Sequence, residues 1–412
     1  MPTAVLADAL LDPETSESVR PATVLIEGGR VVAAGRRGEI QVPRDAVVVD
    51  AEGLTLLPGL IDCHVHLCFP GSGLDLGERL AAPASLVVLQ AVDSCRKTLN
   101  AGFTTVRDAG GTPNGVRLAV ERGLFPGPRM VLAIQILSQT GGHADNHFPC
   151  GVTVNWNPTP DLPPPVVDGV EPMRQRVRHL IREGADWIKL CTSGGVLSPG
   201  DSPHHATFTP DEITAAVTEA ATQGRRVMAH AQAAAGIKNA LRAGVATIEH
   251  GIWIDDEALE LFSAGGQALV PTLVAPRWVI RHAEAGRMPV WAAAKAQDVG
   301  ADHDASIKRA IEAGVEIAFG TDTGVGLQGT MGEEFLLLRQ LGLPADDCLR
   351  TATTVAARVL RLEDQLGTLK VGAYGDLIAV PGDPLQQLEL LADPASVHLV
   401  VKGGEVVKGR AA

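Results

Sequence analysis

The stretch Pro58-Gly59-Leu60-Ile61-Asp62-Cys63-His64-Val65-His66 decides how the chain is understood. An apolar run after a Pro-Gly break predicts a buried strand, and the two-residue period of a strand places His64 and His66 on one face. Two neighbouring imidazoles can bind one metal ion. The alternative is that one or both histidines are hydrogen-bonded core residues. The choice depends on whether the rest of the chain supplies further ligands.

The length and charge of the chain limit its fold and its partners. A (β/α)₈ barrel with a small additional domain would account for all 412 residues without a second large core. The formal net charge of −13 argues against a surface for nucleic acid or anionic membranes, because either requires clustered Lys and Arg. The charge is compatible with cations and with neutral or small zwitterionic substrates, and we expect a small-molecule substrate.

The cysteines and the N-terminus predict a cytoplasmic protein. The six cysteines are scattered, without the paired spacing of a disulfide framework or a zinc finger, so we expect reduced thiols. Acidic residues near the N-terminus argue against a secretory signal, and no apolar run approaches the length of a membrane span.

Both ends of the chain carry β-hairpin signals. Paired glycines, Gly28-Gly29 and Gly403-Gly404, separate short β-branched runs and supply the positive φ that two-residue hairpin turns require. Each end is too short to bury a core alone. We therefore predict one small β-sandwich domain from residues 1–57 and 366–412, with residues 58–365 inserted between them.

The middle of the chain alternates helix-like stretches with strand-like runs. A glycine commonly ends each helix, because glycine adopts the left-handed conformation at a helix C-terminus without steric penalty. Eight strands are expected, at residues 58–66, 104–106, 131–137, 187–190, 226–229, 247–249, 269–270 and 317–319. This alternation predicts an α/β fold with a parallel sheet closed into a (β/α)₈ TIM barrel.

Two further features place local structure within this barrel. Thr209-Pro210-Asp211-Glu212 is a capping box with proline at the first helical position, which predicts a helix start. The connections 138–171, which contains Trp156, and 192–209 are long and follow the third and fourth strands. Long loops at the C-terminal face of a barrel are typical of substrate-facing walls or lids. His204 and His205 of the second connection are nevertheless expected to be ordinary surface residues.

Polar residues follow the ends of several predicted strands. Each has an ordinary explanation when taken singly; Asp108, for example, could cap a turn. Together they would be polar groups stranded in a barrel mouth at a cost of several kcal/mol unless they bind something. The residues are His64, His66, Asp108, Lys189, His230, His250 and Asp322.

These motifs resemble the amidohydrolase superfamily over essentially the whole chain. The resemblance lies in the stretch 58–66, in Lys189, in Ala229-His230-Ala231, in Ile248-Glu249-His250-Gly251 and in Gly320-Thr321-Asp322-Thr323-Gly324. Residues 102–108, 140–143, 192–196 and 243–245 are similar to the imidazolonepropionase-like branch. That branch includes Xaa-Pro and Xaa-Arg dipeptidases and related zinc carboxypeptidase-like enzymes.

The resemblance implies two divalent metal ions, with zinc the first expectation and manganese or cobalt as alternatives. His64, His66 and Asp322 would bind one ion, His230 and His250 the other, and a carboxylated Lys189 would bridge them. A hydroxide held between the ions would attack an amide carbonyl. Asp322 would move its proton to the leaving amine, and His143 would stabilise the oxyanion.

Several substrate contacts are expected from the same resemblance. They are His143, Gly194, Gly195 and Gln232. Peptidases of this branch often carry a tyrosine where this chain has Gln232, and a glutamine amide is not a phenol. Asp62 has two explanations, as a carboxylate supporting the metal ligands or as an ordinary structural one.

Three functions are compatible with these features. The first is a binuclear hydrolase of a dipeptide or an N-acyl amino acid, and the second is a hydrolase of ureas, carbamates or cyclic amides on the same site. The third is a non-catalytic barrel scaffold, against which the complete ligand set argues. Barrels of this kind commonly associate, so we expect a homo-oligomer, although no segment marks an interface.

Overall fold

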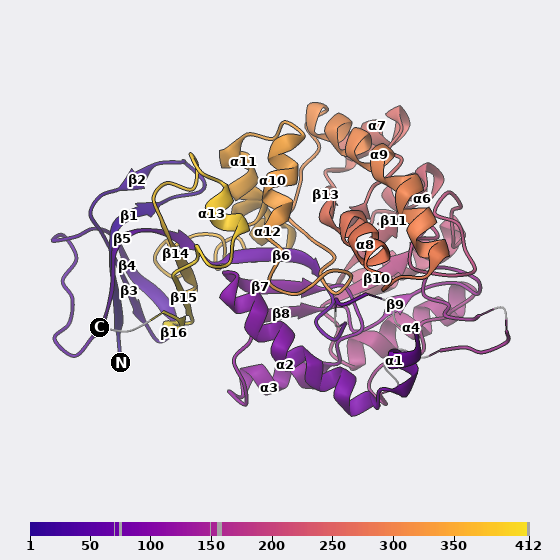
Figure 1. The fold of residues 1–412 in the computed structure, drawn as a ribbon, viewed down its shortest axis with the longest axis horizontal. Helices are drawn as coiled ribbons and strands as arrows, with labels where there is room; N and C mark the ends of the chain where they lie inside the picture. Colours follow the sequence, from indigo (N-terminus) through magenta and orange to yellow (C-terminus); the bar gives the residue numbers. More distant parts are fainter. Residues whose placement is uncertain (70, 74–75, 149, 155–158, 410–412) are drawn as a thin grey trace.

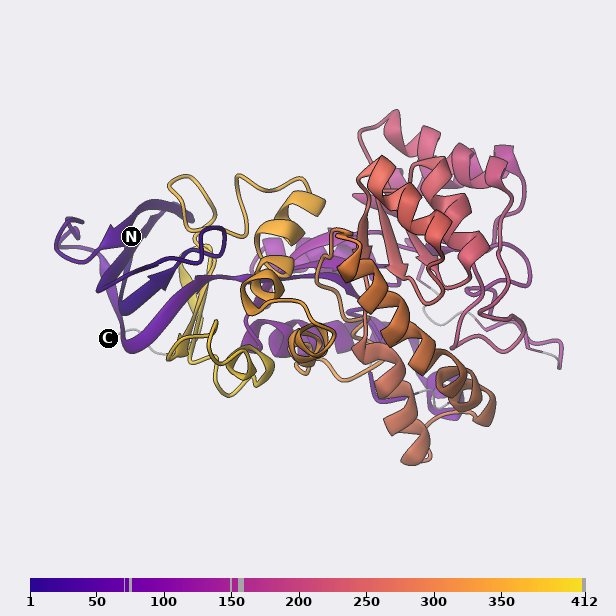
Figure 2. The same ribbon diagram turned by 90° about the horizontal axis from the view of Figure 1, so that it is seen from above.

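The computed structural model describes residues 1–69, 71–73, 76–148, 150–154 and 159–409, so Trp156 lies outside the described residues. Figure 1 shows a sheet from both ends of the chain at one end of the molecule and a larger α/β part at the other. Figure 2 shows the same division from above. Within the described ranges, no helix is both long enough and apolar enough to span a membrane.

The terminal sheet joins the first and last strands of the chain. Its strands are β1 (Thr3–Leu11), β2 (Ser18–Val19), β3 (Ala22–Glu27), β4 (Arg30–Arg36), β5 (Val47–Pro58), β14 (Leu377–Pro381), β15 (Leu399–Lys402) and β16 (Glu405–Lys408). Strand β14 pairs with β5 and so links the two ends. Both predicted hairpins are confirmed, with Glu27 opposite Arg30 and Lys402 opposite Glu405. The strands form a single eight-stranded sheet, so the division into a two-layer sandwich stays a prediction.

The middle of the chain contains two parallel sheets. One has three strands, β6 (Leu60–Val65), β7 (Phe103–Asp108) and β8 (Arg129–Leu132). The other has five, β9 (Ile136–Leu137), β10 (Trp187–Cys191), β11 (Arg226–Ala231), β12 (Thr247–His250) and β13 (Ala268–Val270). The prediction of a single strand at 131–137 is wrong in one respect. It is divided into β8 and β9, because Ile134 between them has a φ of 67°.

The eighth predicted strand, 317–319, is also different from the expectation. Ile317 makes only an isolated bridge to Leu269, and the segment forms no named strand. Its backbone is nevertheless shared between both parallel sheets. Ala318 N donates to Leu269 O of β13 at 2.9 Å, and Cys63 N of β6 donates to Phe319 O at 2.8 Å. The segment 317–319 pairs with β13 and with β6 over too few residues to form a regular strand.

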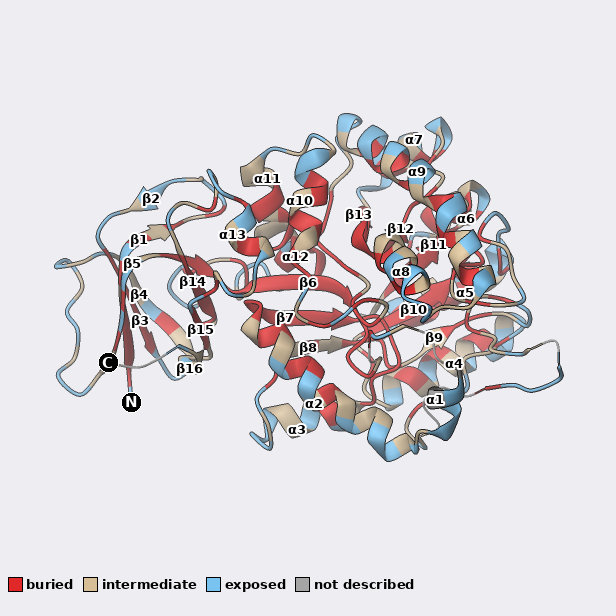
Figure 3. Cartoon of the chain, viewed as in Figure 1, coloured by how far each residue is buried: buried red, intermediate tan, exposed pale blue. Residues whose placement is uncertain are grey.

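Helices cover the outside of these strands. They are α1 (Leu76–Ala81), α2 (Ala84–Asn100), α3 (Asn114–Glu121), α4 (Val170–Arg182), α5 (Pro210–Ala221), α6 (Ala234–Ala243), α7 (Asp256–Gly265), α8 (Val274–Glu284), α9 (Val290–Glu312), α10 (Glu333–Gln340), α11 (Ala345–Thr351), α12 (Thr354–Val359) and α13 (Glu389–Ala392). Figure 3 shows buried strands inside and helices that expose their outer faces. The capping box is confirmed, since Thr209 Oγ1 accepts from Glu212 N and Glu212 Oε2 accepts from Thr209 N.

The two long connections are tied at their bases. In the first, Ser138 N donates to Pro165 O at 3.0 Å and Val167 N donates to Ser138 O at 2.9 Å. In the second, Thr207 N donates to Thr192 O at 2.9 Å. His204 and His205 are exposed, as expected. Fixed bases of this kind allow each connection to hold side chains in defined positions at the ends of β9 and β10.

Candidate active site

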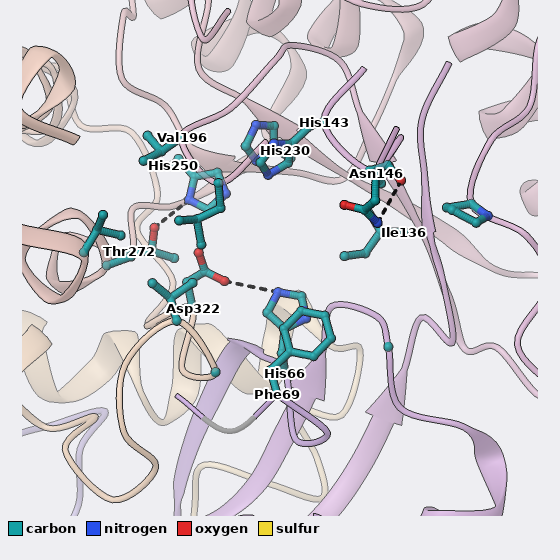
Figure 4. Close-up of a pocket in the computed structure, with 18 of the residues that line it drawn as sticks. His66, Phe69, Ile136, His143, Asn146, Val196, His230, His250, Thr272 and Asp322 are labelled. Carbon is teal, nitrogen blue, oxygen red and sulfur yellow. Dashed lines mark hydrogen bonds and ion pairs between the residues drawn. The ribbon is translucent and has the colours of Figure 1, made fainter. Parts of the chain in front are cut away.

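A cavity of about 460 Å³ opens where the parallel strands end. Figure 4 shows His66, His143, His230, His250 and Asp322 arranged around it. Both long connections contribute to its wall, with Asp145, Asn146 and Val166 from the first and Val196 and Leu197 from the second. The part of the wall that packs with Val196 and Leu197 is apolar. It includes Ile252, Val279, Met288 and Val299.

The predicted metal ligands converge at one side of this cavity. One ligand atom from each of His64, His250 and Asp322 lies within 4.8 Å of the other two. His66 Nε2 lies 3.1 Å from Asp322 Oδ1, and Lys189 Nζ lies 3.3 Å from His64 Nε2. The ring of His230 lies 4.7 Å from that of His250. The structure therefore brings together all six residues that the sequence proposed as ligands.

The protein anchors one ring nitrogen of each histidine. His64 Nδ1 donates to Glu249 Oε2 at 2.6 Å, and His66 Nδ1 donates to Gly110 O at 2.7 Å. His250 Nδ1 is hydrogen-bonded to Thr272 Oγ1 at 2.7 Å. His230 uses its other nitrogen, because its Nε2 donates to Gly194 O at 3.0 Å. Each ring keeps one nitrogen for a ligand, which is the usual arrangement around a metal ion.

The protonation of three of these histidines suits cation binding. Burial, with added positive charge nearby, lowers the pKa of His64, His230 and His250 well below the ordinary value. Burial would also lower the pKa of His66, but the hydrogen bond and charge of Asp322 outweigh it and raise that pKa. A neutral imidazole is the form that coordinates a metal.

Lys189 is buried in this cluster, whereas Asp322 is partly exposed and lines the cavity. Burial lowers the pKa of Lys189, whose Nζ lies 3.3 Å from His64 Nε2. An amine whose cationic form is disfavoured is the kind that can react with CO₂. Burial would raise the pKa of Asp322, but the hydrogen bond from His66 and the charges of His64 and His66 lower it.

Two site residues have unusual backbone conformations. His250 has a φ of 73° and Asp322 a φ of 58°, values that side chains other than glycine rarely adopt. Thr272, which supports His250, has a φ of 52°. Such strain persists where the surrounding structure determines it and is commonly found at functional sites. Here it occurs where the chain leaves its strand and enters the cavity.

Arg107 and Glu249 belong to the site but were missed at the sequence level. Both side chains are fully buried, and Arg107 Nη2 donates to Glu249 Oε1 at 3.0 Å and Oε2 at 3.2 Å. Arg107 Nε also donates to Cys63 O at 2.6 Å. Glu249 therefore links Arg107 to His64. The available signal was a charged residue directly before a strand-end residue, Arg107 before Asp108 and Glu249 before His250.

The two other carboxylates noted in the sequence do not enter the cluster. Asp108 accepts hydrogen bonds from Leu67 N at 2.8 Å, Gly110 N at 3.0 Å and Thr112 Oγ1 at 2.7 Å, so it caps a turn. Asp62 accepts from His64 N at 2.9 Å and from Thr321 Oγ1 at 2.6 Å. Asp62 thus connects the segment that carries His64 to the segment that carries Asp322. Burial raises the pKa of Asp62 to about 7.

The residues predicted to contact substrate lie in two different places. His143 and Gln232 line the cavity. Gly194 and Gly195 are not among the described lining residues. They allow close packing, since a Cβ on Gly195 would lie 2.3 Å from His143 Cε1 and one on Gly194 would lie 2.3 Å from Ser202 O. Contact between these glycines and substrate stays a prediction.

Comparisons with known proteins agree with this geometry. A sequence profile described as the amidohydrolase family matches residues 55–407. The ochratoxinase of Aspergillus niger is 33% identical over 420 aligned residues, which cover 98% of this chain and 86% of that protein.

Two solved structures are similar over nearly their entire length. A prolidase in complex with N-methylphosphonate-L-proline has a TM-score of 0.92 and 37% identity, with 100% of both chains covered. A Xaa-Pro dipeptidase with bound methionine in the active site has a TM-score of 0.90 and 33% identity, with 99% of this chain and 100% of that chain covered. The chain therefore belongs to the amidohydrolase family.

Proposed function

We propose that this hydrolase of carbon–nitrogen bonds uses two divalent metal ions to cleave the amide bond of a small substrate, either a dipeptide or an N-acyl amino acid. The observation that carries the proposal is the convergence of four histidines, Asp322 and Lys189, with one nitrogen of every histidine anchored by the protein. The amidohydrolase, ochratoxinase and prolidase relationships support the same reaction class.

The donor set fits divalent cations. Imidazoles, a carboxylate and a carboxylated lysine are ligands that zinc, and also manganese or cobalt, accept. His64, His66 and Asp322 would hold one ion, and His230 and His250 the other, with Lys189 between them after carboxylation. When bound, the ions would polarise a carbonyl group and lower the pKa of water.

The remaining steps fall to side chains of the cavity. Asp322 is ionised, because its pKa is lowered, and it reaches the cavity, so it can accept a proton and pass it to the leaving amine. His143 lines the same cavity and can meet the carbonyl oxygen of a substrate. The apolar wall that includes Ile252, Val279 and Met288 favours an apolar acyl group or side chain.

The site also depends on a barrel-like arrangement of the two parallel sheets. We infer that they act as one (β/α)₈ barrel, with the segment 317–322 in the place of the eighth strand. Hydrogen bonds from this segment to β13 and from β6 to it support that inference, as does Asp322 N donating to His64 O at 2.7 Å. This pairing brings the residues that follow β6 next to Asp322.

The test combines metal analysis with a substrate panel. Protein purified without chelator should contain about two transition-metal ions per chain, and it should release amino acids from dipeptides or N-acyl amino acids. Release from neither class, together with cleavage of ureas or carbamates, would replace the substrate proposal by its alternative. Absence of both bound metal and turnover would favour the scaffold.

Asp322→Asn provides the mechanistic test. The variant should lose turnover while keeping bound metal, because the amide can still coordinate but cannot accept the proton. Asp298→Asn is a matched control, since Asp298 pairs with His204 at 2.8 Å on the exposed surface. Retained turnover in Asp322→Asn would refute the assignment of Asp322 as the proton acceptor.

A further inference from the structure

We propose that Lys295 is a positioning residue that fixes the width of an apolar subsite, and that this subsite selects substrates with a bulky apolar group beside the scissile amide. The inference rests on the proposed function, because it names the part of the substrate that the cavity recognises. The apolar subsite consists of five side chains that line the cavity, Val196, Leu197, Ile252, Val279 and Val299.

The apolar subsite lies between separate segments of the chain. Val196 and Leu197 belong to the second long connection, Ile252 follows β12, and Val279 and Val299 belong to α8 and α9. Four of these side chains are members of one buried cluster, and the partly buried Leu197 packs against it. Figure 4 includes Val196 among the residues around the cavity. The width of the subsite therefore depends on how the second connection is placed against α8 and α9.

The part of the second connection that carries the two subsite residues is a turn closed by Asp201. Asp201 Oδ2 accepts a hydrogen bond from Gly195 N at 2.9 Å, and Oδ1 accepts one from Ser198 Oγ at 2.5 Å. The Asp201 side chain is only 4% exposed. Because these hydrogen bonds lie within the segment 195–201, they fix the internal shape of the turn but not its position relative to α9.

Lys295 of α9 connects this turn to the helix. Its Nζ donates to the carbonyl oxygens of Gly195 at 3.0 Å, Ser198 at 2.8 Å and Asp201 at 2.7 Å, and it lies 2.9 Å from Asp201 Oδ1. One ammonium group thus binds the beginning, the middle and the end of the turn. Val299 follows Lys295 by four residues and so lies on the same face of α9. Lys295 therefore sets the separation between Val299 and the turn.

A second link between this connection and α9 is weaker. His204 Nε2 lies 2.8 Å from Asp298 Oδ2, but the two side chains are 51% and 57% exposed, and an exposed pair contributes little. Without Lys295, the turn would keep its internal hydrogen bonds and lose its main attachment to α9. The expected consequence is a wider, less defined subsite rather than an unfolded loop.

The width of the subsite matters for only one kind of substrate. A bulky apolar group gains affinity from close contact with the walls that surround it, and a small gap already removes part of that attraction. A small group leaves the subsite largely empty whatever its width. Lys295 should therefore affect the preference for bulky groups.

The test measures a selectivity ratio, which is kcat/KM for a bulky substrate divided by kcat/KM for a small one. One series varies the acyl group from acetyl to benzoyl on a constant amino acid. The other varies the amino acid from glycine to phenylalanine under a constant acetyl group. Wild type should prefer the bulky member of one series by about 10-fold or more, and that series identifies the side of the amide that enters the subsite.

Lys295→Met should lower this ratio by about 10-fold, because the bulky group loses wall contacts. A Cβ on Gly195 would overlap the ring of His143, so a shift of the turn can also disturb His143. That disturbance, like a loss of folded protein, lowers kcat/KM for both members and cancels in the ratio. Lys308→Met is the matched control, since Lys308 is on the same helix but 59% exposed. It should keep the wild-type ratio.

Leu197→Ala tests whether Lys295 acts through the turn. This substitution removes part of the subsite, so it should lower the ratio by itself. Adding Lys295→Met should then lower the ratio less than it does in wild type, because the turn has less of the subsite left to place.

Three results would overturn the proposal. They are an unchanged ratio in Lys295→Met, an equal fall in Lys308→Met, and a wild type that prefers the bulky member in neither series. Should Lys295→Met fail to fold, its combination with Asp201→Asn replaces it, because no buried charge then lacks a partner. A wild type that cleaves no member of either series refutes the proposed function. Calorimetric titration with the same compounds then supplies a ratio of dissociation constants, for which the same results are expected.

Discussion

Replacing Arg107 with methionine should lower the free energy of unfolding by about 3–5 kcal/mol, the usual loss when one partner of a buried ion pair is removed. Arg107 and Glu249 are both fully buried, with Arg107 Nη2 at 3.0 Å from Glu249 Oε1. Methionine fills much of the space but leaves the carboxylate without its cation.

The hydrogen bonds around the pair decide where in that range the loss falls. Arg107 also donates to Cys63 O and to Thr247 Oγ1, and a buried acceptor left unpaired costs about 1–3 kcal/mol. Glu249 keeps its hydrogen bonds from His64 and Thr247, which stabilise the remaining charge. The opposing effects place the loss within the range rather than above it. For a chain of this length, the melting temperature should fall by about 3–6 °C.

The assay is urea-induced unfolding at fixed pH, salt and metal concentration, with an exposed pair as control. Arg358 Nη2 lies 2.5 Å from Glu316 Oε2, but the side chains are 51% and 36% exposed. Arg358→Met should therefore cost less than about 0.5 kcal/mol despite the shorter distance. Adding Glu249→Gln to Arg107→Met should restore part of the loss, because no buried charge then lacks a partner. Equal losses in Arg107→Met and Arg358→Met, or no restoration, would refute the argument from burial.

Two further predictions concern the surroundings of the site. Glu249→Gln should weaken metal binding by about 10- to 100-fold in chelator competition, because His64 Nδ1 loses an anionic partner; Glu219→Gln, a carboxylate paired with Arg178 away from the cavity, should leave it unchanged. Burial raises the pKa of Glu334 from its ordinary 4.5 to about 8, so between these pH values the folded chain binds a proton that the unfolded chain releases. That contribution to stability is complete below pH 4.5 and is lost as the pH rises through 8. The urea midpoint, measured from pH 4 to 9, should therefore fall as the pH rises. Glu334→Gln should make this fall smaller.

The sequence was sufficient for the elements whose signals are local. Gly28-Gly29 and Gly403-Gly404 predicted two hairpins, and Thr209 with Glu212 predicted a helix start, because turn and cap chemistry depend on a few adjacent residues. The proposed metal ligands could also be predicted from the sequence. His64 and His66 are two residues apart on one strand, and parallel strands end at the same rim, so polar residues at strand ends were expected to converge.

The features that were missed depend on contacts between distant segments. The irregular backbone at 317–319 follows from sharing its hydrogen bonds between β13 and β6. The left-handed φ of His250 and Asp322 is imposed by tertiary structure against the local preference of these residues. Arg107 joins Glu249 across 142 positions of sequence. Nothing in the period of either strand indicated that two charged side chains would face each other in the interior.

The anchoring of the histidines has a common origin in the parallel sheets. His66 follows β6 and is held by Gly110, which follows the adjacent β7; His250 ends β12 and is held by Thr272 after the adjacent β13. His230 of β11 is likewise held by Gly194, after the adjacent β10. In a parallel sheet the loop next to each strand end lies beside it, so it can supply the carbonyl or hydroxyl that orients an imidazole. These rings are therefore oriented by the fold itself, and a cation that binds does not have to bear the free-energy cost of ordering them. His64 is the exception among the four histidines. A residue of a non-adjacent strand, Glu249 of β12, orients it. The orientation of His64 consequently depends on the buried Arg107–Glu249 pair, so Arg107→Met should disturb His64 more than the other three histidines.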